Sequence, residues 1–214
     1  MAEFEVFKKI AQIKIVPLVT VDNIEDAVPL AQALVAGGVP VAEVTFRTPL
    51  GGEAIKRIAK EVPDCIVGSG TVHDIDHAWE TLDNGGKFVI TPGFNPKVVD
   101  WCLKHDLPVC PGTVTPADLE QALDFGLKVV KFFPAGAYGG TKTLKALQGP
   151  FADLKFVPTG GVSLDNLLEY LSLSNVAAAG GSFIPPSNLV KARDWDGIVE
   201  LGKKINEMIA PLKK

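Results

Sequence analysis

Short apolar runs rich in β-branched residues recur along the chain, with segments of helical periodicity between them. Such runs are typical of strands that are buried on both faces of a parallel sheet. About eight are present, spaced by roughly 20 to 28 residues: 13–19, 41–47, 65–71, 87–91, 107–113, 128–134, 154–160 and 175–181. Several segments between them begin with Asp, Asn, Ser or Thr and end with Gly, which are helix start and stop signals.

A strand followed by a helix, repeated about eight times, predicts one α/β domain over residues 1–214 with the (β/α)8 TIM-barrel fold. An open doubly wound sheet is the alternative, because a strand count from sequence is easily wrong by about one or two. The regular spacing and the lack of a full GxGxxG motif favour the barrel. The segment MAEFEVFKKIAQ (1–12) predicts an additional amphipathic N-terminal helix that covers the bottom of the barrel.

Charge and composition exclude several classes of partner. A net charge of -4, with no basic block before the Lys213–Lys214 tail, argues against nucleic-acid binding. Although 47% of the residues are apolar, no apolar run reaches the roughly 20 residues that span a bilayer, so no membrane partner is expected. Cys65, Cys102 and Cys110 form neither a CxxC motif nor an even set, and no charged-then-apolar leader is present. We therefore expect a reduced, cytoplasmic protein.

One charged residue interrupts a run that is otherwise apolar. In LKVVKFFPA (127–135), Lys131 lies between Val130 and Phe132. An ammonium group held among apolar side chains loses hydration, so its pKa is expected to fall, and a neutral amine attacks a ketone to form a Schiff base. That imine is an electron sink for making or breaking a carbon–carbon bond without a metal. The alternative is that Lys131 only forms a buried ion pair with Glu43, which is a weak source of stability.

Polar residues gather where the apolar runs end, and barrel enzymes build their sites at the carboxyl ends of strands. Because side chains alternate along a strand, Glu43, Thr45 and Arg47 share one face. Lys131 and Phe133 likewise share a face of their own strand. If both faces point inward, a carboxylate, a guanidinium and an amine meet at one end of a dry barrel.

Glycines follow the last two runs, at Gly160–Gly161 and at Gly180–Gly181, where Ser182 comes next. Barrels often hold a phosphate group on backbone N–H groups at these two strand ends, and glycine lets the backbone approach closely. Glycine pairs also end strands in ordinary turns, so phosphate binding is one of two interpretations.

Several segments follow one another in register over almost the whole chain: EVTFRTP, GSGTV, ITPGF, PGTVTPADLEQALDFGLKVVKFFPA, KALQGPF, FVPTGGVSLDN and AAGGSF. Together they resemble the 2-keto-3-deoxy-6-phosphogluconate/4-hydroxy-2-oxoglutarate aldolase family. The resemblance implies a class I aldolase on a (β/α)8 barrel, a homotrimer with no cofactor. It implies reversible cleavage of 2-keto-3-deoxy-6-phosphogluconate to pyruvate and glyceraldehyde 3-phosphate, and also of 4-hydroxy-2-oxoglutarate to pyruvate and glyoxylate.

The resemblance also implies a role for individual residues. Lys131 forms the Schiff base, Glu43 is the general acid and base, and Arg47 clamps the carboxylate of the keto acid. The other substrate-binding residues are Thr71 and Pro92 at the pyruvyl end, Phe133 against the pyruvyl carbons, Thr159 at the hydroxylated middle, and Gly160, Gly161, Gly180, Gly181 and Ser182 at the phosphate.

One position departs from some members of that family, which carry an arginine at the end of the first strand. This chain reads VPLVTV (16–21) there, with Thr20 as the nearest polar residue. How the charge of the aldehyde half is recognised is therefore left open, and so is the preference between phosphorylated and unphosphorylated substrates.

Other features receive a structural interpretation. His73 and His77 have metal-ligand spacing, but no third ligand accompanies them and Asp74 is a natural N-cap, so no metal site is predicted. The three tryptophans are expected to pack from helical segments: Trp79, Trp101 and Trp195.

Two functions of other classes share part of the pattern. A phosphate-binding barrel isomerase or synthase would have the same glycine ends and could use Glu43 as a base, but it would not need Lys131 as a nucleophile. A non-catalytic sugar-phosphate sensor could keep the glycines without the acid/base pair. Borohydride reduction in the presence of pyruvate separates both from an aldolase.

Overall fold

The computed structural model describes residues 5–213, in which strands alternate with helices. Each of the eight apolar runs contains strand residues, as predicted. The strands are β1 (Ile15–Val19), β2 (Val41–Thr45), β3 (Ile66–Gly70), β4 (Val89–Ile90), β5 (Val109–Cys110), β6 (Gly112–Thr113), β7 (Val129–Phe132), β8 (Lys155–Pro158) and β9 (Ala179–Gly181). The helices are α1 (Glu5–Ile13), η1 (Ile24–Asp26), α2 (Ala27–Ala36), α3 (Gly51–Glu61), α4 (Ile75–Asp83), α5 (Pro96–Lys104), α6 (Pro116–Asp124), α7 (Gly140–Leu147), α8 (Leu167–Leu171), α9 (Ser187–Ala192), α10 (Trp195–Ile209) and η2 (Ala210–Leu212).

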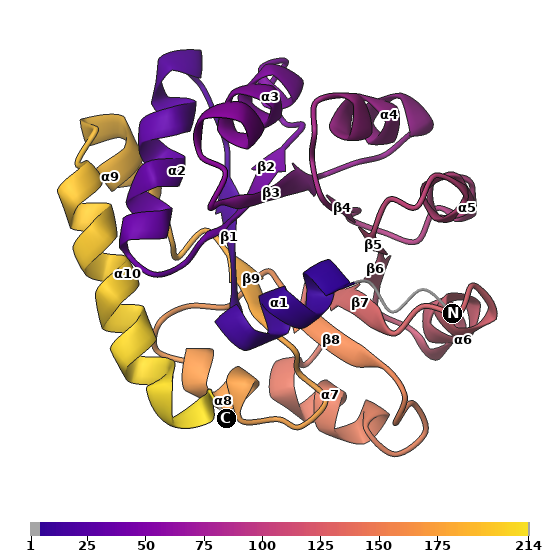
Figure 1. Cartoon of the computed structure of the whole chain (residues 1–214). Coiled ribbons are helices and arrows are strands. Elements are labelled where there is room, and N and C mark those ends of the chain that lie inside the picture. The colour runs from indigo at the N-terminus through magenta and orange to yellow at the C-terminus, as the bar shows by residue number, and fades with distance from the viewer. Residues whose placement is uncertain (1–4, 214) are drawn as a thin grey trace.

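The strands pair in parallel and form a curled sheet with helices on its outer side (Figure 1). One group has the order β5-β4-β3-β2-β1-β9, and the other has the order β6-β7-β8. Isolated bridges from Phe156 to Val176 and from Thr159 to Gly180 connect β8 with the segment that contains β9. The fifth apolar run is divided at Pro111 into β5 and β6, because proline has no N–H group for the ladder.

Side-chain caps start several of the outer helices, as the sequence predicts. Asp74 accepts a hydrogen bond from the His77 N–H at the start of α4. Thr115 and Asp118 form a reciprocal capping box at the start of α6, where Pro116 occupies the first turn. Such caps satisfy N–H groups that have no partner inside the helix, which fixes where each helix leaves the preceding strand end.

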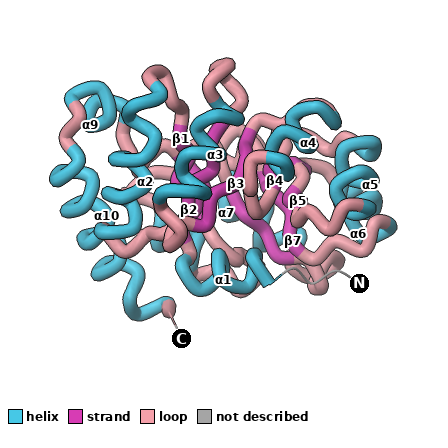
Figure 2. Tube along the Cα trace, turned by 45° about the horizontal axis from the view of Figure 1, so that its top comes forward, coloured by secondary structure: helices cyan, strands magenta, loops and turns pink. Residues whose placement is uncertain are grey.

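Helix α1 covers the amino ends of the strands. Its residues Phe7 and Ile10 are buried in a cluster with Val16, Val41 and Phe88, which lie at the starts of strands or just before one. Burial of each large apolar side chain stabilises the fold by about 1.5–3 kcal/mol. Figure 2 shows α1 beneath the strands, with helices α2 to α6 around the outside. The polar residues lie at the opposite, carboxyl ends of the strands. Residues 1–4 of the expected N-terminal helix lie outside the described part of the chain.

The tryptophans do not all pack as expected. Trp101 and Trp195 are partly buried against the core, but Trp79 is 56% exposed, so the packing prediction is wrong for that residue. Trp79 lies on α4 with Ile75 and Leu82, which are also exposed. Positions i, i+4 and i+7 share one face of a helix, so α4 carries an apolar stripe that points away from the core.

Within residues 5–213, none of the helices combines the length and the apolar character that crossing a membrane requires.

Candidate active site

Lys131 and Glu43 meet inside the curled sheet. Lys131 is the third residue of β7 and Glu43 the third residue of β2. The Lys131 Nζ atom lies 3.5 Å from Glu43 Oε1, and their side chains are only 5% and 1% exposed. Two chain segments that are far apart in sequence therefore bring an amine and a carboxyl group together in a dry interior, as the alternation of side chains predicts.

The Glu43 carboxyl group is poised to exchange a proton. Burial raises its pKa above the ordinary value near 4.5, while the positive charges of Lys131 and Arg47 act in the opposite direction. Among the described residues, neither carboxyl oxygen has a hydrogen-bond partner. The 3.5 Å ion pair with Lys131 is thus the only polar contact of this carboxyl group within the described part of the chain, and buried carboxyl groups with so few partners are costly and concentrated at functional sites.

The backbone around Lys131 holds its side chain in place. The Lys131 N–H donates to the Pro111 carbonyl at 2.9 Å, and the Thr113 hydroxyl donates to the Lys131 carbonyl at 2.9 Å. The Nζ atom lies 5.0 Å from the centre of the Phe133 ring, within range of a cation–π contact. The Lys131 backbone is thus fixed by Pro111 and Thr113, and its amine contacts the ring of Phe133, which directly follows β7.

Gly70 makes room for Glu43, a role that sequence reasoning missed. A Cβ atom at Gly70 would lie 2.3 Å from Glu43 Oε1, closer than any real contact. In the ladder Gly70 is opposite Thr45, two positions beyond Glu43. Glycine inside a strand weakens it and often marks a close approach, so the GSG segment carried a signal that motif searching alone could not interpret.

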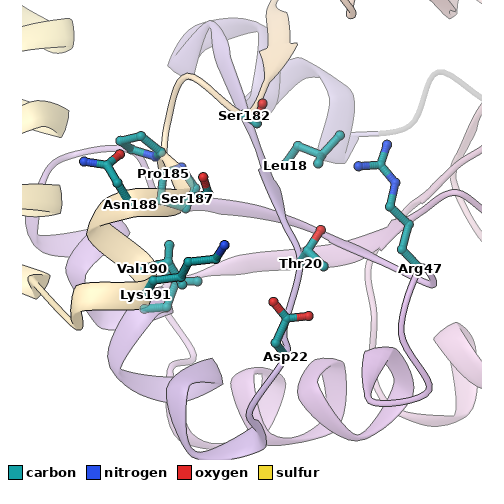
Figure 3. Close-up of a pocket in the computed structure, with 12 residues that line it drawn as sticks. Leu18, Thr20, Asp22, Arg47, Ser182, Pro185, Ser187, Asn188, Val190 and Lys191 are labelled. Carbon is teal, nitrogen blue, oxygen red and sulfur yellow. The ribbon is translucent and has the colours of Figure 1, made fainter.

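Arg47 is not inside the sheet, which corrects one expectation. Strand β2 ends at Thr45, and the chain then turns, so strand alternation does not set the direction of Arg47. Arg47 is exposed and lines a pocket of about 400 Å³ together with Thr20 and Ser182 (Figure 3). The guanidinium group lies at the rim of the site, while the amine and the carboxyl group lie below it.

Other predicted site residues lie at neighbouring strand ends. Thr71 directly follows β3 with a φ of 60°, a left-handed conformation that a β-branched residue rarely adopts. Pro92 follows β4, and its carbonyl oxygen would lie 2.2 Å from a Cβ atom at Gly112. The left-handed conformation of Thr71 is strained, and strain of this kind clusters at functional sites.

The two glycine pairs come together, as predicted. Thr159 at the end of β8 bridges to Gly180 in β9, and a Cβ atom at Gly180 would lie 2.6 Å from the Thr159 hydroxyl oxygen. Gly160 and Gly161 both have a φ of +84°, which favours glycine. A Cβ atom at Gly160 would also lie 3.1 Å from the Phe133 ring. Ser182 follows β9, so Thr159, both glycine pairs and Ser182 form one rim that adjoins the Arg47 pocket.

The histidines and cysteines have structural surroundings. The His77 ring stacks on Phe46 with centroids 4.3 Å apart. Within residues 5–213, no group of three or more His, Cys, Asp and Glu side chains is arranged to hold a metal ion. Burial raises the pKa of the Cys65 and Cys102 thiols to about 12, so neither is a reactive thiolate near neutral pH.

Comparisons with known proteins agree with this geometry. Residues 6–201 match the family model described as "Aldolase: KDPG and KHG aldolase". A 2-dehydro-3-deoxy-phosphogluconate aldolase of Treponema pallidum (strain Nichols) is 42% identical over 204 residues, covering 95% of this chain and 97% of the relative.

Two solved structures are also similar. KDPG aldolase from Legionella pneumophila, with pyruvate captured at low pH as a covalent carbinolamine intermediate, has a TM-score of 0.91 and 37% identity, covering 95% of this chain and 98% of the other. The 2-keto-3-deoxy-6-phosphogluconate aldolase of Zymomonas mobilis ZM4, with 3-phosphoglycerate, has a TM-score of 0.87 and 35% identity, covering 92% and 93%.

Proposed function

The chain belongs to the KDPG and KHG aldolase family, and we propose that it cleaves 2-keto-3-deoxy-6-phosphogluconate reversibly through a Schiff base on Lys131. The products are pyruvate and glyceraldehyde 3-phosphate, and 4-hydroxy-2-oxoglutarate is a second substrate, giving pyruvate and glyoxylate. The buried contact of 3.5 Å between Lys131 and Glu43 carries the proposal, because it places a nucleophile beside a proton acceptor. Release of pyruvate from both purified substrates, assayed side by side, tests it.

The first stage forms the imine. A proton moves from the Lys131 ammonium to Glu43, which the raised pKa of that carboxyl group favours. The neutral amine adds to the C2 carbonyl of the substrate and gives a carbinolamine. Glu43 returns the proton to the departing hydroxyl group, water leaves, and the C2 carbon is then an iminium carbon.

The second stage breaks the carbon–carbon bond. Glu43 takes the proton of the C4 hydroxyl group, the C3–C4 bond breaks, and its electron pair moves into the iminium to give an enamine. The C4 end leaves as the aldehyde. Glu43 then returns the proton to C3 of the enamine, and hydrolysis of the imine releases pyruvate and regenerates the Lys131 amine. Since the imine accepts the electrons, we propose no metal and no other cofactor.

Residues at the rim bind the two ends of the substrate. Arg47 binds the carboxylate of the keto acid, for which its planar fork is suited. Thr71 and Pro92 line the pyruvyl end, and Phe133 packs on the pyruvyl carbons beside Lys131. Thr159 contacts the hydroxylated middle.

The phosphate end lies at the carboxyl ends of β8 and β9. The backbone N–H groups near Gly160, Gly161, Gly180 and Gly181 and the Ser182 hydroxyl would hold the dianion. The 3-phosphoglycerate with the Zymomonas mobilis enzyme supports a phosphorylated ligand for a relative of this fold.

Ser182→Ala is expected to lower kcat/KM selectively for 2-keto-3-deoxy-6-phosphogluconate. Loss of one hydroxyl donor to a charged acceptor costs about 1–3 kcal/mol, whereas 2-keto-3-deoxygluconate ends in a neutral hydroxyl group and should be little affected. The control is Ser172→Ala, at the end of α8. Equal losses on both substrates would assign Ser182 to the shape of the rim instead of to phosphate binding.

The strand pairing supports a closed barrel, and the cysteines are compatible with a cytoplasmic location. We propose a single domain over residues 1–214 in which the curled sheet closes as a (β/α)8 barrel, with α1 over its bottom. The bridges between β8 and the β9 segment support closure on one side, and the continuity of β5 with β6 through Pro111 supports it on the other. The three free, buried cysteines are compatible with a reducing, cytoplasmic location.

The proposed assembly is a homotrimer. Its support is the exposed apolar stripe on α4, Ile75, Trp79 and Leu82, because exposed apolar surface of this kind marks contact sites.

Trp79→Glu is expected to shift the protein from trimer to monomer in sedimentation velocity at micromolar concentration, because burying a charged group at an apolar contact is costly. Leu168→Glu, at an exposed apolar position on α8, is the matched control and should remain trimeric. A monomeric wild-type protein, or a Trp79→Glu trimer as stable as wild type, would contradict the proposal.

A further inference from the structure

The pocket beside Arg47 extends beyond the residues that the chemistry uses. Its volume of about 400 Å³ suits a small-molecule ligand. Figure 3 shows its walls: Thr20 and Asp22 come from the carboxyl end of β1, Ser182 follows β9, and Lys191 comes from α9. The side chains of Lys191 and Arg47 extend toward the middle from opposite sides.

Within the described part of the chain, the Lys191 ammonium group has no partner of its own. Some helix lysines pair with a carboxylate three or four residues before them, as Lys104 does with Asp100 and Lys203 with Glu200. The corresponding positions before Lys191 are Ser187 and Asn188, which carry no charge. Across residues 5–213, Lys191 has neither an ion pair nor a side-chain hydrogen bond. A cation that points into a pocket and forms no ion pair there is available to an anionic ligand.

Contacts at the end of α9 fix the position of this lysine. Arg193, two residues beyond, pairs with Asp26 at 2.8 Å, which ties the end of α9 to the segment after β1. Asp194 caps α10 by accepting the Gly197 N–H at 2.9 Å, so it is committed to the helix start. The wall that carries Lys191 is therefore held against the wall that carries Thr20 and Asp22.

The charges of the pocket favour one anion besides the keto acid carboxylate. Arg47 and Lys191 are its cations and Asp22 is its anion. The end of β1 supplies no cation, since Leu18, Val19 and Thr20 are uncharged. If Arg47 holds the carboxylate, Lys191 is the cation left for the other end of the substrate. An ammonium group is a point charge, so it attracts a phosphate dianion in many orientations.

We infer, on the basis of the aldol cleavage proposed above, that Lys191 determines specificity by binding the anionic terminus of the aldehyde half. It acts together with Ser182, which lines the same pocket. Asp22 faces that terminus as a like charge and weakens its binding. Lys191 and Asp22 together set the preference for a phosphorylated over a neutral-ended substrate, and neither contacts the atoms that react.

Lys191→Ala is expected to raise KM for 2-keto-3-deoxy-6-phosphogluconate about tenfold. This is a small effect for a charge-assisted contact, and it is expected to be small because Lys191 is exposed to solvent. The kcat value and all parameters for 2-keto-3-deoxygluconate should stay near wild type. Lys191→Arg keeps the charge and should retain most of the affinity. Lys204→Ala, at an exposed lysine of α10, is the control and should leave both substrates unchanged.

Asp22→Asn gives a second test in the opposite direction, because removal of the like charge should lower KM for the phosphorylated substrate only. Equal effects of Lys191→Ala on both substrates, or no effect on either, would overturn the inference. Trapping of pyruvate on Lys131 with borohydride is measured in every variant. If the wild-type protein does not trap pyruvate, the proposed aldolase function is wrong. If it does trap pyruvate but Lys191→Ala has no selective effect on the phosphorylated substrate, only the proposed role of Lys191 is wrong.

Discussion

Lys131→Met is expected to abolish cleavage of every 2-keto-3-deoxy acid, because methionine keeps the length and apolar contacts of the side chain but has no nucleophile. The imine is the electron sink for the bond that breaks, so no slower route through the same site remains. Release of pyruvate, followed with a coupled dehydrogenase, measures the loss. Lys128→Met, on the same segment before β7, is the control and should retain activity. Substantial activity in Lys131→Met would show that cleavage does not proceed through a Schiff base on Lys131.

The Lys131→Met variant should still fold, but its stability should depend on pH. Burial already raises the pKa of Glu43, and removal of the Lys131 charge takes away an effect that lowers it. A group whose pKa is raised by folding stabilises the native state below its unfolded pKa, near 4.5 for Glu43, and loses that contribution as the pH rises through the folded value. The midpoint temperature of thermal unfolding of Lys131→Met should therefore lie further below that of the wild-type protein at pH 8 than at pH 5.

Glu43→Gln is expected to lower kcat by about 10²–10⁴, because the amide fits the same space beside Gly70 but cannot take a proton. Formation of the carbinolamine, its dehydration and the bond cleavage each need a proton moved at this position. Reduction of imine that has formed slowly should still label Lys131. Glu53→Gln, which changes an exposed carboxylate on α3, is the matched control.

A Glu43→Gln enzyme with near-normal kcat would mean that another group moves the protons. Among the described neighbours, Thr45 and Thr159 are buried polar residues near the same strand ends. Neither threonine has the acidity of a carboxyl group. A near-normal kcat in Glu43→Gln would therefore indicate that water molecules carry the protons.

The sequence predicted the pairing of Lys131 with Glu43 because both lie within regular strands. There, alternation sets the direction of a side chain, and parallel strands bring their carboxyl ends to one edge. Beyond the ends of the strands, alternation no longer predicts the direction of a side chain. Arg47 lies in a turn after β2, whose direction depends on contacts that no local pattern encodes.

Other features needed the three-dimensional arrangement. The role of Gly70 follows from its distance to Glu43 across two strands, and the split of the fifth run at Pro111 depends on which N–H groups the ladder uses. The exposure of Trp79 could not be read from its helical segment, since an apolar face suits both a core and a surface contact. Lys191 had no motif at all, and only its place in the pocket distinguishes it from a solvated lysine.

The proposed mechanism requires a covalent imine between Lys131 and the keto acid. Incubation with pyruvate and sodium borohydride traps this imine, and intact-mass measurement with peptide mapping then locates it. We predict inactivation with one reduced pyruvyl group per chain, located on Lys131 and absent from Lys131→Met. No adduct, or an adduct on another lysine at the same level in both proteins, would mean that Lys131 is not the residue that forms the imine.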